Sequence, residues 1–151
     1  LQLTMTTGEL FAKYGALQAT QRDDKTINDP TYWLGSMTPR ATGRMLEDIQ
    51  RCSDGARPAV ASKAACADML QMFRAQQSGA RRLPHFLAVP VGHKTGDFPP
   101  VLANDVGIIY ARSGPIVVAF FLNGIRGSYA EAEDHIGRVA QLIVEYFDGV
   151  Q

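Results

Sequence analysis

The sequence has no excess of charge of either sign, because its 151 residues carry 15 Lys and Arg against 15 Asp and Glu. No basic or acidic run stands out, which argues against nucleic acid and anionic membrane as partners. Long hydrophobic runs are lacking too. The longest, PIVVAFFL at 115–122, is too short to span a bilayer and indicates a buried strand. We therefore expect one domain, with no membrane span and a sizeable core.

Cysteine is scarce, with only Cys52 and Cys66, and their spacing matches no zinc motif. Two alternatives stay open: one disulfide in an oxidising compartment, or two buried free thiols. The three histidines, at 85, 93 and 135, show no metal-ligand spacing. No metal or other cofactor is expected.

The chain begins at Leu1, without Met and without a signal peptide before it. We expect a processed product, an expressed segment or a piece of a longer protein. Thr6 and Glu9 form a capping box that predicts a helix near 8–18, and the polar stretch 21–30 predicts a surface loop.

A helical hairpin is predicted next. Thr38 as N-cap and Pro39 at the first helical position begin one helix over TPRATGRMLEDIQRC. SDGARP at 53–58 breaks the apolar pattern, and a second helix follows over about 59–76.

The remainder is rich in β-forming residues. Strands are predicted over 86–95, 105–111 and 115–124, with a tight turn at Ser113-Gly114 between the last two. A capping box at Ser128 and Glu131 begins a terminal amphipathic helix that ends at Gly149. The order predicts an α+β fold in which three antiparallel strands carry the last helix on one face. The expected subdivision is 1–35, a helical hairpin over 36–80, and strands with the terminal helix over 84–151.

The stretch VPVGHKTGDFPP at 89–100 admits two functional interpretations. A phosphate loop needs a glycine directly before the lysine and a helix after it. Here His93 precedes Lys94, and Phe98-Pro99-Pro100 forbids a helix, so the phosphate loop is rejected. The other interpretation is a Lys-Thr-Gly strand, in which the lysine and threonine hold a substrate carboxylate and the glycine leaves room for the substrate.

Three stretches make the chain similar to class A β-lactamases and the related penicillin-binding serine hydrolases. SMTPRATGRMLEDI resembles the Thr-Pro helix that follows their omega loop. GHKTG with NDVGIIYARSGPIVVAFFLNG resembles their last three strands, and AEDHIGRVAQLIVEYF resembles their C-terminal helix. Residues 1–35 would then be the omega-loop-like region. The resemblance implies a hydrolase acting on β-lactam, peptide or ester substrates in the periplasm or outside the cell.

Carried onto this sequence, the resemblance implies that Lys94, Thr95 and Gly96 line the substrate cleft. It also implies that the backbone N–H of Asp97 is one of two oxyanion donors. Where many relatives place a carboxylate-binding arginine on the next strand, this chain reads NDVG. That contact is lost or comes from elsewhere.

The family's catalytic serine motif is missing from these residues. No S-x-x-K occurs, and Ser53-Asp54-Gly55 lies in a turn between helices and is no counterpart of S-D-N. We expect the C-terminal part of a larger serine hydrolase, inactive alone, that joins its N-terminal part or another copy through an exposed sheet edge. The alternative is a non-catalytic binding or structural module. No E-x-x-L-N precedes Thr38, so the family's water-activating base is absent, and Glu9 is the candidate substitute.

Overall fold

The fold is described by a computed structural model that covers residues 37–56 and 60–149. The helix predicted over 8–18, the loop at 21–30 and Glu9 lie outside the described residues. Within them, no helix is long and apolar enough to cross a membrane.

The first described helix, α3, spans Pro39–Ser53 and begins where the capping signal predicted. The Thr38 hydroxyl accepts a hydrogen bond from the Ala41 backbone N–H at 3.1 Å. Proline is tolerated at the first helical position because its missing N–H would have no partner within the helix there. The boundary is therefore set by local chemistry alone.

The second helix, α4, spans Lys63–Arg74 and is shorter than the predicted range of 59–76. Ser62 is its N-cap, and the Ser62 hydroxyl accepts from the Ala65 N–H at 3.1 Å. An N-cap residue has extended backbone geometry, so the helix cannot begin before Lys63. The apolar pattern alone did not reveal this cap.

The three predicted antiparallel strands are confirmed as β1 (Val91–Phe98), β2 (Leu102–Ala111) and β3 (Gly114–Asn123), paired in the order β1-β2-β3. The predicted start of the first strand at residue 86 is wrong. Three successive turn bonds lie just before β1, from Arg82 N–H to Gly79 O, His85 N–H to Arg82 O and Leu87 N–H to Pro84 O. This backbone is folded on itself and cannot join a sheet.

The terminal helix, α5, spans Tyr129–Asp148 as predicted. The Ser128 hydroxyl accepts from the Glu131 N–H at 3.3 Å. Gly149 ends the helix at φ 69°, a left-handed conformation that glycine adopts without steric cost.

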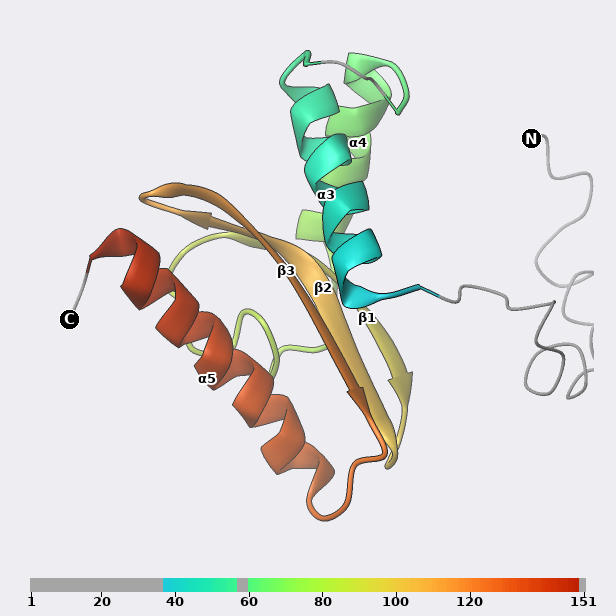
Figure 1. The fold of residues 1–151 in the computed structure, drawn as a ribbon, viewed down its shortest axis with the longest axis vertical. Coiled ribbons are helices and arrows are strands. Elements are labelled where there is room, and N and C mark those ends of the chain that lie inside the picture. Colours follow the sequence, from blue (N-terminus) through green and yellow to red (C-terminus); the bar gives the residue numbers. More distant parts are fainter. Residues whose placement is uncertain (1–36, 57–59, 150–151) are drawn as a thin grey trace, which may run out of the picture. The chain divides into compact units, whose positions relative to one another are not determined.

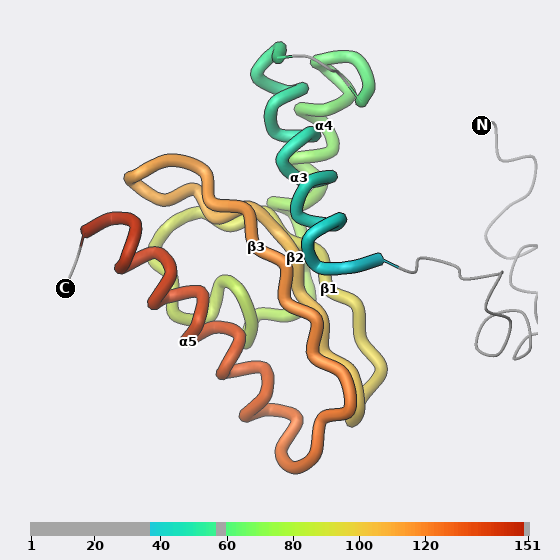
Figure 2. Tube along the Cα trace, viewed as in Figure 1, coloured from blue at the N-terminus to red at the C-terminus, as the bar shows by residue number. Residues whose placement is uncertain are grey.

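The sheet separates two hydrophobic clusters. In Figures 1 and 2, α3 and α4 lie side by side on one side of the sheet, and α5 runs along the other. Because side chains alternate along a strand, β2 and β3 contribute to both clusters. Leu46, Ile49, Leu70 and Ile108 form the buried core under the helical hairpin. Leu83, Ile109, Val118, Ile136 and Ala140 form the core under α5.

A disulfide joins α3 to α4 between Cys52 and Cys66, across a sequence separation of 14. Both cysteines are buried. Of the two alternatives that the sequence left open, the structure contains the cross-link. The bond joins the last turn of α3 to the first turn of α4, next to the loop that connects them. Other side chains of the two helices pack on the sheet.

We expect the double substitution C52S/C66S to lower the free energy of unfolding by about 3 kcal/mol, the value for a loop of this length. Urea denaturation followed by circular dichroism measures it. Reducing the unsubstituted chain with dithiothreitol serves as the control and should cause a loss of similar size. Equal stability of the oxidised and reduced chains would contradict the role given to this bond.

Candidate functional site

The candidate site lies along β1, which pairs only with β2 among the described strands and so has a free edge. The Tyr110 N–H donates to Pro90 O at 2.9 Å just before β1, and the pairing register continues through Thr95↔Asp105 and Asp97↔Ala103. Hydrogen-bonded and non-hydrogen-bonded pairs alternate along an antiparallel ladder. Counting from Pro90, the backbone N–H groups of Thr95 and Asp97 therefore point away from β2, toward the free edge.

Lys94 is exposed at this edge, and its Nζ donates to the Thr95 carbonyl oxygen at 2.8 Å. That contact agrees with a Thr95 carbonyl that points outward. Side chains at even positions of β1 face the helical hairpin, since a Cβ added to Gly92 would meet Phe73 and Arg74 of α4 at 3.3 Å. Lys94 and Gly96 lie on that face.

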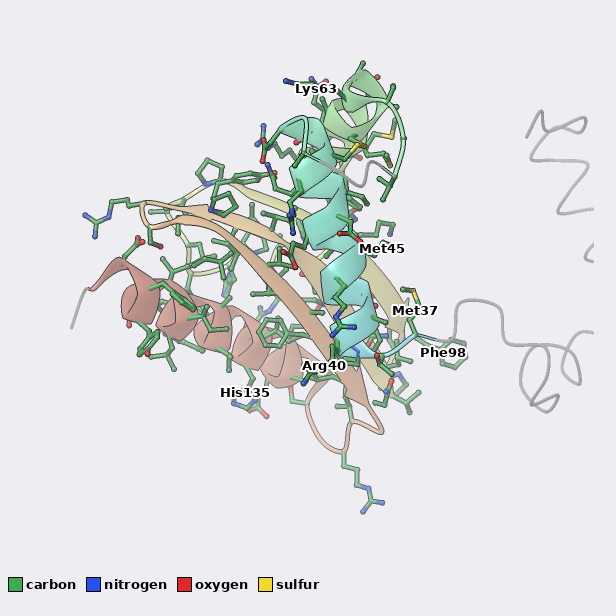
Figure 3. All side chains as sticks on the ribbon, turned by 45° about the horizontal axis from the view of Figure 1, so that its top comes forward. Met37, Arg40, Met45, Lys63, Phe98 and His135 are labelled. Carbon is green, nitrogen blue, oxygen red and sulfur yellow. A yellow bond between two sulfur atoms is a disulfide. The ribbon has the colours of Figure 1, made fainter. Side chains whose placement is uncertain are left out.

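Gly96 leaves open space beside Lys94. A Cβ built there would meet only the Asn104 Cβ within 4 Å, at an ordinary contact distance of 3.8 Å. A side chain at position 96 would occupy the open space beside β1 that a ligand could otherwise enter. Phe98, two residues further on, is exposed and projects from the end of β1 (Figure 3).

The Thr95 hydroxyl is part of a small polar cluster with the loop that follows α4. Its Oγ1 lies 2.8 Å from Ser78 Oγ, and Gln76 Nε2 donates to it at 3.4 Å. Gly79 allows the loop to approach this closely, because a Cβ there would lie 2.4 Å from Thr95 Cγ2. Gly79 also has φ of 78°, which disfavours other residues.

His93 of β1 and Asp105 of β2 are both buried, on the face of the sheet opposite Lys94. Its Nδ1 lies 2.9 Å and 3.0 Å from the two carboxylate oxygens of Asp105, so Nδ1 carries the proton and donates. Asp105 Oδ2 also accepts from the Leu83 N–H at 3.2 Å. The pair anchors β1 to β2 and to the preceding loop. Nothing in the sequence indicated this role for Asp105, which the sequence analysis noted only as part of NDVG.

Arg82 is the main residue that sequence analysis missed. It is only 2% exposed, and its guanidinium reaches β1, β2 and α5. Nη1 donates to the Asp97 carboxylate and, at 3.0 Å, to the Asn104 carbonyl oxygen. Nε donates to Glu133 at 3.0 Å and Nη2 to the Tyr129 hydroxyl at 3.1 Å.

These partners determine the ionisation of Arg82. Burial acts to lower the pKa of Arg82, but the hydrogen bond and negative charge of Asp97, together with Glu133, outweigh it and raise the pKa. The guanidinium therefore stays charged, as it must to hold two carboxylates. Arg82 thus fixes the side chain of Asp97, whose N–H points to the free edge.

The arrangement offers an ammonium group, a hydroxyl and outward N–H donors along one strand edge. Such a surface can bind a polarised carbonyl or an anion. Of the described residues, no group of three or more His, Cys, Asp or Glu could hold a metal ion. Ser53 hydrogen-bonds to Gln50 O at 2.7 Å, at the end of α3, and takes no part in this edge.

The model of the beta-lactamase enzyme family matches residues 2–147 of this sequence. The fold is similar to the TLA-1 extended spectrum beta-lactamase, with a TM-score of 0.67 and 22% identity over 92% of this chain and 52% of that one. A beta-lactamase from Sphaerobacter thermophilus has a TM-score of 0.62 and 27% identity over 75% of this chain and 41% of its own.

A class A beta-lactamase from Bacteroides cellulosilyticus has a TM-score of 0.67 and 20% identity, over 93% of this chain and 53% of its own. The chain thus spans about half the length of these solved structures. A search of curated proteins found no match. The likeness in structure confirms the expected fold, and the activity of a whole protein is a separate question.

We expect R82M to lower the free energy of unfolding by about 3–5 kcal/mol, because it leaves the Asp97 and Glu133 carboxylates without their buried partner. The matched control is R81M. Arg81 pairs with Asp134 at 2.6 Å, but its side chain is 51% exposed, so about 1 kcal/mol or less should be lost. Urea denaturation compares the two, and equal losses would show that Arg82 has no special role.

Proposed function

The chain belongs to the beta-lactamase enzyme family, and from this premise we propose that it supplies the substrate-binding strand of a serine hydrolase. The reaction would be acyl transfer on β-lactam, peptide or ester substrates. The observation that carries the proposal is the free edge of β1, where Lys94 and Gly96 stand open and the N–H groups of Thr95 and Asp97 point outward.

Each residue of the edge has a role in this proposal. The Asp97 N–H is a donor for the oxyanion that forms during acyl transfer, as the family resemblance implies. Lys94 supplies positive charge, and Gly96 leaves room for the substrate backbone. A hydroxyl has one donor and two acceptor positions. Thr95 can therefore accept from Gln76 and Ser78 and still donate its own proton to a substrate.

The nucleophile is proposed to lie in a polypeptide outside these 151 residues. The absence of S-x-x-K from the sequence supports this. The second oxyanion donor would be the N–H of that serine. Without E-x-x-L-N, the complete enzyme would acylate as a penicillin-binding protein or an esterase does and would release its acyl group slowly, with Glu9 as the candidate base.

A periplasmic or secreted location is proposed with this function. The disulfide between Cys52 and Cys66 supports it, because disulfides form and persist in oxidising compartments.

The proposed partner is the N-terminal part of the hydrolase or a second copy of this chain. The outer edge of β3 has no paired strand among the described ones. Beside it, an open apolar hollow is lined by Ser113–Val118 with Ile143 and Phe147. The outer surface of α5 continues this apolar area with the exposed side chains Val139, Leu142, Tyr146 and Phe147. Unpaired edges and exposed apolar patches of this kind favour association.

We expect the isolated chain to show no covalent adduct after incubation with benzylpenicillin, because no activated serine is present. Intact-mass spectrometry measures this. If the coding region that precedes Leu1 contains S-x-x-K followed by S-D-N, the joined protein should be labelled. K94A should then slow its labelling by about 10- to 100-fold, the value of a charged hydrogen bond.

The matched control is K63A, which removes an exposed lysine at the start of α4 and should leave the labelling rate unchanged. Stoichiometric labelling of the isolated chain would overturn the proposal. An upstream region without these motifs would favour the non-catalytic module.

We expect the isolated chain to self-associate in a concentration-dependent way, because no described strand pairs with the β3 edge and the apolar side chains on α5 are exposed. Size-exclusion chromatography with light scattering measures the mass. L142E/Y146E on α5 should return the chain to a monomer. M72E is the control, since Met72 is exposed and apolar but lies on α4. A monomer at millimolar concentration would contradict the expectation.

A further inference from the structure

We propose that Asp97 sets the ligand preference of the β1 edge, and that its carboxylate makes the edge favour uncharged acyl substrates over those carrying a carboxylate beside Thr95. The inference rests on the proposed function, because it names the substrate class of the same site.

Arg82 is close to the edge but is occupied by protein groups. Its guanidinium makes four hydrogen bonds, to Asp97, Asn104, Glu133 and Tyr129. Nη2 also lies 3.0 Å from Glu133 Oε1. An anionic ligand would have to displace one of these partners to reach the arginine.

Asp97 is the outermost member of this cluster. The Arg82 side chain is 2% exposed and that of Glu133 16%, whereas that of Asp97 is 33% exposed. The Asp97 carboxylate therefore presents negative charge to solvent at the place where a ligand would approach Arg82.

The charges of the cluster do not cancel. One guanidinium, Arg82, is paired with two carboxylates, Asp97 and Glu133, which leaves one net negative charge. The neighbouring ion pair of Arg81 with Asp134 is neutral as a pair and does not change this balance. The Lys94 side chain leaves β1 on the face toward the helical hairpin, and its Nζ is hydrogen-bonded to the Thr95 carbonyl oxygen at the edge, at 2.8 Å.

Thr95 and Asp97 are two residues apart on the same face of β1, so their side chains are about 7 Å apart. A ligand carboxylate held by the Thr95 hydroxyl would lie at about that distance from the Asp97 carboxylate. Two like charges so placed in a protein surface lower the affinity on the order of tenfold. An ester or amide in the same position would meet no such repulsion.

The test uses benzylpenicillin, which carries a carboxylate, and its methyl ester, which does not. Both are titrated into the full 151-residue chain, and the amide signals of Thr95, Gly96 and Asp97 are followed by NMR. The wild-type chain should bind the ester at least as tightly as the acid. D97N should tighten binding of the acid about tenfold relative to binding of the ester, as the removed repulsion requires.

E133Q is the matched control, because it removes the same charge from the same cluster at a less exposed position. It should change the affinity for the acid by less than about threefold. An equal gain in E133Q and D97N would assign the effect to net charge and overturn the role of Asp97. The comparison of the two ligands on the wild-type chain decides the matter even if a variant does not fold.

Tighter binding of the acid than of the ester by the wild-type chain would overturn this inference while the site itself stands. If neither ligand shifts the β1 amide signals in any variant, the proposed site fails, and the inference fails with it.

Discussion

The buried guanidinium of Arg82 is the interaction on which the candidate site depends. It connects the loop before β1 with Asp97 on β1, the Asn104 carbonyl on β2 and Glu133 on α5. Taking a charge out of water is costly unless partners replace the lost solvation, and two carboxylates and two neutral oxygens do so here. Because the same guanidinium joins the core under α5 to the end of the site strand, packing and binding geometry are coupled at this point.

The second constraint is that β1 is an edge strand between two different environments. Its odd positions face α5 and the preceding loop, where His93 and Asp97 find partners, while its even positions face the helical hairpin. Its backbone donors at Thr95 and Asp97 have no strand beside them among the described elements. One short segment thus supplies buried anchors, exposed charge and outward N–H groups. This is possible because successive side chains of a strand point to opposite faces of the sheet and successive backbone N–H groups point to opposite edges.

The opposite edge of the sheet differs in chemistry. The hollow beside β3 is mostly apolar, and α5 adds the exposed apolar side chains Leu142, Tyr146 and Phe147 near it, whereas the β1 edge is polar and charged. A polar edge is suited to a ligand that binds transiently, and an apolar surface is suited to a stable protein interface. The disulfide lies at neither edge but in the helical hairpin, where it holds α3 and α4 together independently of what binds the sheet.

Features that depend on neighbours a few residues away could be predicted from the sequence. The caps at Thr38 and Ser128 and the three strands were predicted because capping and strand patterns act locally. The start of β1 was missed because turn bonds between residues 79 and 87 override an apolar run. The disulfide and the role of Arg82 became clear only from the folded chain, because the partners of Arg82 lie 15 to 51 residues away. No spacing rule joins such residues, since packing of the sheet against α5 brings them together.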